Sequence, residues 1–450
     1  MGPRLILLGA IGLAVSFAGL WLDIGFIAQP FYAYAWWSYI FMLDGFVAWR
    51  RGSSLLTTRR RHLPTILLWS VTFWYFFELL NLRYQNWYYV GVLGVGSVGD
   101  ALSGALFAAA AFATVFMGLF ETYEVLTAYG LARRVVIRPR QLAPWVSYGV
   151  QSLGAVMVTL SLVFPYYLAP LVWGSLTFLV DPWNYRCGAR SILAEFERGH
   201  LGVVVRLLVA GLLCGLVWES FNFLAPQKWI YTVRGLEELK LFEMPVLGFL
   251  GFPALALDAF AAYGALAYLF HANRTWEHPD EVSQRLEPRA PLATRAFAAM
   301  LPLHLVFWGI VGLLAMTTNV GSLQLELEHL ETLPPGGAAT LEAADIRRPR
   351  HLLPALEEPG RRDRIRESLE LTDDGMKELY EETRLLTHKG IGHHHGAHLR
   401  RLGYRRVEDL RGADVEALYA KLETARDGAR FPALRPSMVR VWVLAAETEP

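Results

Sequence analysis

The chain has 450 residues, of which 54% are apolar and only 18% are charged, and its formal net charge is +1. This charge averages an arginine-rich part with parts of mixed charge, so it gives no indication of nucleic-acid binding. The two cysteines, Cys187 and Cys214, suit neither a disulfide framework nor a zinc site. The sequence predicts no metal site and leaves any cofactor unidentified.

Long apolar runs recur along the first 320 residues. Each has about 18 residues or more, the length that crosses the hydrocarbon core of a membrane as a helix. No small-residue cleavage site follows the first run, so we expect it to be an uncleaved anchor. We predict nine spans, at residues 5–22, 31–49, 64–82, 101–123, 143–163, 166–182, 203–223, 248–270 and 296–318.

Arginine marks one side of the predicted membrane. The loops near residues 50–61, 133–140, 186–198 and 274–295 are rich in arginine, whereas the alternate loops carry few basic residues. The positive-inside rule then places the N-terminus in the cytoplasm and the region after the ninth span outside. We therefore predict a multi-pass protein of a bacterial inner membrane with a periplasmic C-terminal domain.

Two segments of the chain match each other. Residues 78–89 and residues 219–231 both read E-x-x-N followed by W-x-Y. Asp44 and Asp181, each followed by an arginine and a glycine, match in the same order. Spans one to four therefore correspond to spans five to eight, and an even number of helices per copy puts both copies the same way up.

This correspondence predicts an all-α polytopic membrane protein with two parallel four-helix repeats and a ninth helix. The repeats are expected at residues 1–130 and 131–275. A cytoplasmic loop with the ninth transmembrane helix is expected at 276–320, and a small soluble helical domain at 321–450.

The E-x-x-N segments carry the candidate site. An ionisable side chain within a span is costly, and Glu78 and Glu219 are therefore functional candidates by default. Asn81 shares a helix face with Glu78, as Asn222 does with Glu219. We expect both helices to face a central cleft near the outer surface, with Glu78 and Glu219 as candidate catalytic residues. The predicted substrate-binding residues are Asn81, Trp87, Tyr89, Asn222, Trp229, Tyr231, Glu243, Asp100 and Asp258.

Structural alternatives stand beside this interpretation. In the first alternative Glu78 and Glu219 are paired, for example with Arg83 or Arg206, and serve to lock the helices together. Asp44 and Asp181 lie near the predicted inner face beside arginines, where we favour a structural ion pair.

The order of an acidic residue, W-x-Y and a glycine-rich apolar segment resembles the lycopene cyclase domain of membrane-embedded carotenoid cyclases. Glu78, Trp87 and the segment 246–249 carry the resemblance, and those cyclases are also built from duplicated small membrane domains. The Pro-Leu-Glu-Glu motif of that family is absent from both copies here. The resemblance implies protonation of an alkene by a buried carboxylic acid, with aromatic faces around the carbocation.

The C-terminal region contains Lys389-Gly390-Ile391-Gly392, followed by regularly spaced apolar residues up to Tyr419. This segment resembles the helix-hairpin-helix domains of bacterial proteins, in which G-I-G forms the tight turn. Such modules often bind the DNA backbone, but the interleaved acids and the predicted outer location argue against nucleic acid, and we favour a protein partner. His388, His393, His394, His395 and His398 are expected to form a surface cluster and not a metal site.

Three classes of function remain open, and the sequence does not decide whether a reaction is catalysed. The first is binding or conversion of a membrane lipid or lipophilic small molecule, including an isoprenoid. The second is a transporter or channel whose duplicated carboxylates coordinate a cation or proton. The third is a membrane scaffold that docks a partner through its C-terminal domain.

Overall fold

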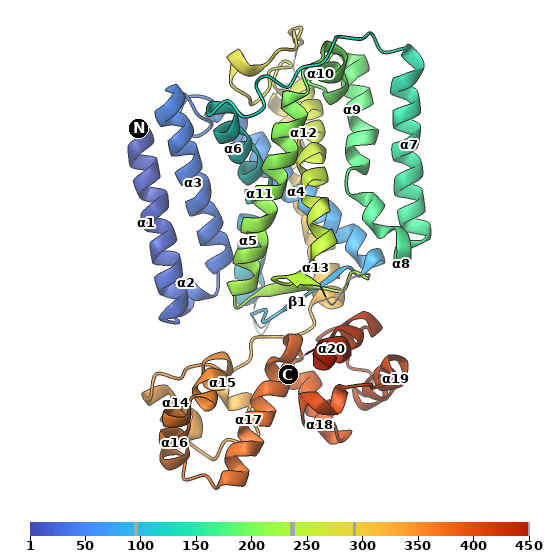
Figure 1. Cartoon of the computed structure of the whole chain (residues 1–450). Helices are drawn as coiled ribbons and strands as arrows, with labels where there is room; N and C mark the ends of the chain where they lie inside the picture. Colours follow the sequence, from blue (N-terminus) through green and yellow to red (C-terminus); the bar gives the residue numbers. More distant parts are fainter. Residues whose placement is uncertain (94–97, 235–238, 291–293, 449–450) are drawn as a thin grey trace. The chain divides into compact units, whose positions relative to one another are not determined.

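The computed structural model describes residues 1–93, 98–234, 239–290 and 294–448, without the side chains of residues 98, 100, 101 and 294–299. The regular secondary structure of the described residues is almost entirely helical (Figure 1). It forms two compact units. Unit 1 comprises Met1–Tyr84, Ala105–Ala225 and Arg234–Gly312, and unit 2 comprises Gln85–Gly104, Pro226–Val233 and Leu313–Pro450.

Within the described part of the chain, seven helical segments are long and apolar enough to cross a membrane. They are Gly2–Trp21, Arg60–Tyr84, Leu102–Ala128, Pro144–Val163, Gly202–Leu224, Val246–Phe270 and Met300–Asn319. These seven agree with seven of the nine predicted spans, and the chain is a multi-pass membrane protein.

The other two predicted spans are not among these seven segments. α3 (Phe31–Arg51) is long enough, but it contains Asp44 and several aromatic residues of low hydropathy. α9 (Ser175–Cys187) has 13 residues, because α8 (Pro165–Leu168) and the 3-10 helix η2 (Ala169–Val172) take up the first part of the predicted range.

Helix contacts in unit 1 repeat between the two halves of the sequence. α1 packs on α3 as α7 packs on α9, α3 packs on α6 as α9 packs on α12, and α4 packs on α6 as α11 packs on α12. The bounds are α1 (Gly2–Trp21), α4 (Leu63–Tyr84), α6 (Thr114–Ala128), α7 (Pro144–Val163), α11 (Gly202–Leu224) and α12 (Gly251–Phe270). This pairing order is the one that two copies of a four-helix unit would have.

Glycine allows the closest of these approaches. A Cβ atom at Gly9 on α1 would lie 2.5 Å from backbone atoms of α3, and one at Gly154 on α7 would lie 2.8 Å from the backbone of α9. Small residues at such positions let helix backbones come into contact. In a membrane no hydrophobic force drives helices together, and close packing of this kind contributes to their association. In each copy, therefore, a glycine on the first helix allows that helix to pack closely on its neighbour.

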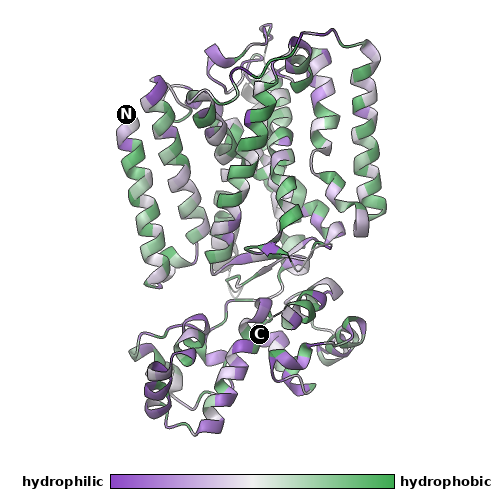
Figure 2. Ribbon diagram, in the orientation of Figure 1, coloured by the Kyte–Doolittle hydropathy of each residue, from purple (hydrophilic) through white to green (hydrophobic). Residues whose placement is uncertain are grey.

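Apolar side chains cover the outside of unit 1. In the most apolar window of the Pro144–Val163 segment only 17% of the residues are buried, and in that of Met300–Asn319 only 11%. Figure 2 shows these helices as predominantly hydrophobic, whereas the helices after residue 330 carry many hydrophilic residues. Exposed apolar surface of this extent is expected of helices that face lipid.

Shorter elements complete unit 1. They are α2 (Gly25–Ala28), α10 (Ile192–Arg198), the strands β3 (Lys240–Leu241) and β4 (Met244–Pro245), and the 3-10 helices η1 (Arg60–His62), η3 (Val246–Leu250) and η4 (Pro279–Glu281). α5 (Val98–Phe112) leads into α6, and α13 (Thr294–Asn319) is the last long apolar helix.

Unit 2 contains a strand pair that the all-α prediction missed. β1 (Trp87–Val90) runs antiparallel to β2 (Lys228–Tyr231), with Trp87 opposite Tyr231 and Tyr89 opposite Trp229. The two W-x-Y segments therefore pair with each other in a register symmetric about Tyr88 and Ile230. Aromatic and β-branched residues are enriched in strands, and the segment Trp87-Tyr88-Tyr89-Val90 consists entirely of them.

The remaining helices of unit 2 enclose two cores. One core joins Tyr88, Val90 and Ile230 of the strand pair to the last four helices, and the other lies among the helices before them. The helices are α14 (Gly337–Ala343), α15 (Pro349–Glu357), α16 (Pro359–Ser368), α17 (Asp373–Thr387), α18 (Gly392–Arg401), α19 (Val415–Ala425) and α20 (Pro436–Thr448), with 3-10 turns η5 (Leu327–His329), η6 (His388–Gly390) and η7 (Val407–Leu410).

Candidate functional site

The E-x-x-N side chains are buried in unit 1. Glu78 and Asn81 on α4 are 1% and 0% exposed, and Glu219 and Asn222 on α11 are both 0% exposed. Each pair occupies one helix face, as the three-residue spacing predicts. The sequence thus located four polar side chains inside the helix bundle, where each needs a polar partner or a neutral state.

Aromatic rings bring the two E-x-x-N helices together. The ring centroids of Trp74 on α4 and Trp218 on α11 are 4.9 Å apart, and Trp74 Nε1 donates a 3.2 Å hydrogen bond to a Glu78 carboxylate oxygen. Trp218 directly precedes Glu219 in the sequence. One ring of α4 therefore contacts one ring of α11, and the central cleft between these helices stays a prediction.

Further rings surround Trp218 and Phe77. Trp36 on α3 and Phe252 on α12 lie edge-on or tilted to Trp218 at 5.9 and 6.0 Å, and Tyr32 contacts it at 6.2 Å. Phe77, next to Glu78, stacks on Trp173 at 4.8 Å with an interplanar angle of 13°. Four segments far apart in the sequence thus contribute aromatic faces near the two glutamates.

The W-x-Y aromatics lie on the strand pair of unit 2. Because strand side chains alternate between faces, Trp87, Tyr89, Trp229 and Tyr231 share one face of the pair, while Tyr88, Val90 and Ile230 on the other face enter the helical core. Their place in one site with Glu78 and Glu219 stays a prediction, since the carboxylates belong to the other unit.

Asp44 and Asp181 have the same local role in the two copies. Ser54 Oγ donates to Asp44 at 2.7 Å and the Leu56 amide at 2.9 Å. Ser191 Oγ donates to Asp181 at 3.0 Å, and the amides of Ile192 and Leu193 donate at 2.7 and 2.9 Å. Each aspartate thus fixes the loop after its helix by accepting from a serine ten residues later, instead of by the ion pair we expected.

The other predicted acids differ in their surroundings. Asp258 on α12 accepts from the Gly174 and Thr177 amides at 2.9 and 2.7 Å and from the Thr177 hydroxyl at 2.6 Å, so it caps the N-terminus of α9. Glu243 is buried in the turn between β3 and β4. Asp100 lies at the start of α5, and its side chain is outside the described residues.

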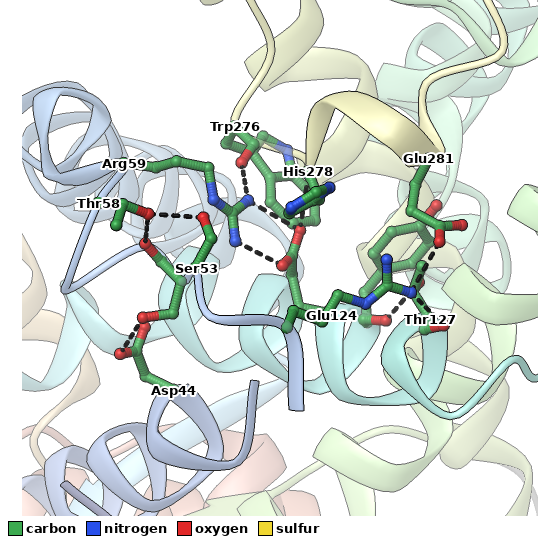
Figure 3. A network of polar contacts seen from close by, with 12 residues as sticks. Asp44, Ser53, Thr58, Arg59, Glu124, Thr127, Trp276, His278 and Glu281 are labelled. Atoms are coloured by element: carbon green, nitrogen blue, oxygen red, sulfur yellow. Dashed lines mark hydrogen bonds and ion pairs between the residues drawn. The ribbon is translucent and has the colours of Figure 1, made fainter. Parts of the chain in front are cut away.

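A second polar cluster in unit 1 was not predicted, and we call it the arginine–carboxylate network (Figure 3). Arg59 donates to both oxygens of Glu124 at 3.0 and 2.6 Å and to the Trp276 carbonyl at 2.5 Å, while the His278 amide donates to Glu124 at 3.1 Å. Burial alone would lower the pKa of Arg59, but the Glu124 carboxylate raises it on balance. Its members are Arg51, Arg59, Arg133, Arg190, Glu124, Glu195, Glu277 and Glu281.

The segment after α12 supplies two of the four acidic residues of this network. Glu277 accepts from Arg190 at 2.6 and 2.9 Å, and Glu281 accepts from Arg51 at 2.7 Å and from Arg133 at 3.1 Å. Trp276 is 1% exposed and stacks on Phe120 at 4.2 Å. The sequence signal for this network was a tryptophan and several acidic residues in a segment that we predicted to be a loop. A tryptophan there indicates burial, because loops exposed to water rarely bury a large ring.

The G-I-G turn of the C-terminal region packs against β1. Gly390 and Gly392 have φ values of +70° and +69°, which favour glycine. A Cβ atom at Gly390 would meet Val90 at 2.2 Å, and the Tyr88 hydroxyl donates to the Lys389 carbonyl at 2.8 Å. The turn is therefore part of the packed interior of unit 2.

The histidine cluster divides into stacked and buried members. The rings of His329 and His393 are 3.9 Å apart, and those of His393 and His394 are 3.8 Å apart. His388 contacts the Trp442 carbonyl at 2.9 Å and His395 the Ala433 carbonyl at 3.1 Å. Among the described residues there is no group of three or more histidine, cysteine or acidic side chains that could hold a metal ion.

Comparison of the chain with protein-family models, with curated proteins and with solved structures found no match. The assignment of function therefore depends on the chemistry of these sites.

Proposed function

We propose that this protein binds a lipophilic molecule of isoprenoid type within the membrane, at the carboxyl groups of Glu78 and Glu219. The observation that carries the proposal is the contact between Trp74 and Trp218, which joins the two helices bearing these glutamates. A hydrated ion gains little from such surroundings, whereas an apolar or unsaturated chain gains contact with aromatic faces.

The chemistry of the site suits an unsaturated substrate. A neutral carboxylic acid can protonate an alkene, and a carboxylate with aromatic rings can stabilise the carbocation that results. In this proposal Glu78 and Glu219 take these two roles, and the rings of Trp74, Trp218 and Trp36 provide the surface. Binding is the primary proposal, and conversion would follow from the same geometry.

Lipid extraction and mass spectrometry of gently purified protein test the proposal. The wild type is compared with the double variant Glu78→Gln/Glu219→Gln, and Glu121→Gln is the control because Glu121 is a buried carboxyl group of unit 1 outside this site. We expect a co-purifying lipophilic molecule that the double variant loses and the control keeps. Equal occupancy in all three proteins would rule out these carboxyl groups as contacts.

Ion or proton transport is a second candidate. The observation in its favour is a set of polar side chains on facing membrane helices: Tyr39 contacts Thr122 at 3.0 Å, and Thr122 contacts Cys214 at 3.2 Å. Proton uptake into liposomes containing the protein, with and without Glu78→Gln, would separate transport from binding.

Docking of a protein partner by unit 2 is the remaining alternative, and the burial of the G-I-G turn supports a role other than nucleic-acid binding.

The proposed topology has nine spans, a cytoplasmic N-terminus and an external C-terminal domain in a bacterial inner membrane. It is supported by the alternation of arginine-rich loops. Single cysteines at the exposed positions Arg134 and Glu367, in a chain lacking Cys187 and Cys214, test it. In intact spheroplasts a membrane-impermeant thiol reagent should label Glu367→Cys and leave Arg134→Cys unlabelled until the membrane is opened. The opposite pattern would invert the topology.

A further inference from the structure

Glu121 on α6 is a buried carboxyl group. Its side chain is 0% exposed, and neither of its oxygens has a hydrogen-bond partner among the residues that the structure describes. Removing an ionised carboxylate from water without compensating donors is far more costly than burying a neutral acid. The surroundings of Glu121 therefore decide which of these two states it adopts.

Two neighbouring carboxyl groups already have their donors. Asp44 on α3 accepts from the Ser54 hydroxyl and the Leu56 amide. Glu124, one helix turn after Glu121, accepts twice from Arg59 and once from the His278 amide. All these groups donate, so the carboxyl oxygens of both neighbours have hydrogen-bond donors, unlike those of Glu121.

The balance of charge around Glu121 is negative. The charged groups that act on it are Asp44, Glu124 and Arg59. Arg59 is engaged by Glu124, so an ionised Glu121 would add a third negative charge to a buried group with one positive charge. Asp44 is also buried, and it lies on α3, which packs on α6.

We propose that Glu121 is a proton-binding site, which holds a proton at neutral pH between the carboxyl groups of Asp44 and Glu124. The ligand is a single proton, and the site is separate from the lipophilic site at Glu78 and Glu219. Since α3 packs on α6, loss of the proton places two like charges between packed helices and weakens that packing. Proton binding at Glu121 thus stabilises the contact between these helices.

Infrared spectroscopy of the full chain in lipid nanodiscs tests the proposal at neutral pH. A buried protonated carboxyl group gives a carbonyl stretching band above the amide region, and this band shifts in heavy water. We expect Glu121→Gln to lose part of the wild-type band. Glu195→Gln is the matched control: Glu195 is also buried, but it is ion-paired with Arg190, and its replacement should leave the band unchanged.

Thermal unfolding of the same proteins provides an independent measurement. Glutamine has nearly the shape of a neutral glutamic acid, so Glu121→Gln should unfold at the wild-type temperature at neutral pH. A band that Glu121→Gln leaves intact would overturn the proposal, as would a large fall in its unfolding temperature.

Glu121→Asp is a second variant, studied beside Glu121→Gln, because it keeps the acid but moves it away from Asp44. The proposal then requires a band of altered position, and an unaltered band would contradict it. None of these readouts depends on lipid occupancy, so the failure of this proposal and that of the lipophilic site are distinguishable.

Discussion

Ser54 donates a hydrogen bond to Asp44, ten residues earlier in the chain, and the second half of the sequence contains the same arrangement. There Ser191 donates to Asp181 across the same spacing. Both aspartates are buried, and both fix the loop that follows an equivalent helix. This shared contact supports the duplication of a four-helix unit and gives the two aspartates a structural role.

Replacing either aspartate by asparagine should destabilise unit 1, because amides and hydroxyls that donate to a carboxylate would lose an acceptor. We expect a loss of about 1–3 kcal/mol for each, with the larger effect at Asp181, which accepts from three groups. Denaturant-induced unfolding in detergent micelles measures it. Ser54→Ala and Ser191→Ala should cost less, and a neutral effect of Asp181→Asn would contradict this role.

The ion pair between Arg59 and Glu124 should be strongly coupled. Both side chains are buried, so removing one partner leaves an uncompensated charge, at a cost of about 3–5 kcal/mol. We expect Arg59→Met and Glu124→Met each to lower the free energy of unfolding by that amount and the double variant to recover part of it. A double-mutant cycle measures the coupling free energy. If the losses of the two single variants simply add in the double variant, the contact has no coupling energy and the prediction is wrong.

Unit 2 should lose stability as the pH falls below neutral. Burial, followed by His329 and His394, lowers the pKa of His393 from 6.5 to about 4, and burial with nearby Arg426 lowers that of His395 to about 3. Between about pH 6.5 and pH 4 the folded chain therefore binds fewer protons than the unfolded chain. The free energy of unfolding should fall through this window by about 2–3 kcal/mol and stay level above it.

Hydrogen exchange of residues 385–446, corrected for the intrinsic effect of pH, measures this loss. His395→Gln should flatten the dependence, whereas His200→Gln in unit 1 should leave it unchanged. Protection that is constant from pH 7 to about pH 4.5 would be inconsistent with neutral buried histidines.

Gly390→Ala should disrupt the contact between the G-I-G turn and β1. The added Cβ atom would meet Val90 at 2.2 Å, and the φ value of +70° is unfavourable for alanine. We expect a loss of roughly 2–4 kcal/mol from strain and overpacking together. Limited proteolysis of unit 2 measures it, and Val90→Ala in the same chain should restore part of the loss. Gly403→Ala is the control, since its φ value is +94° but its Cβ would meet nothing within 4 Å.

Local patterns in the sequence were sufficient to find the apolar helices and the repeat. Hydrophobic length located seven of the predicted spans, and E-x-x-N placed Glu78 and Glu219 on buried helix faces. The G-I-G motif similarly located a turn that requires positive φ. These features depend on residues close together in the chain, where length, spacing and glycine have direct conformational consequences.

The tertiary structure alone decided which segments meet. Trp87 pairs with Tyr231, which lies 144 positions later in the sequence, and Arg59 donates to Glu124 and to the Trp276 carbonyl. Asp44 likewise accepts from a loop instead of pairing with an arginine. A sequence pattern indicates that a polar side chain is buried, but many different residues could provide its hydrogen-bond or ion-pair partner. The choice among them is made by long-range packing of helices, which leaves no local signal.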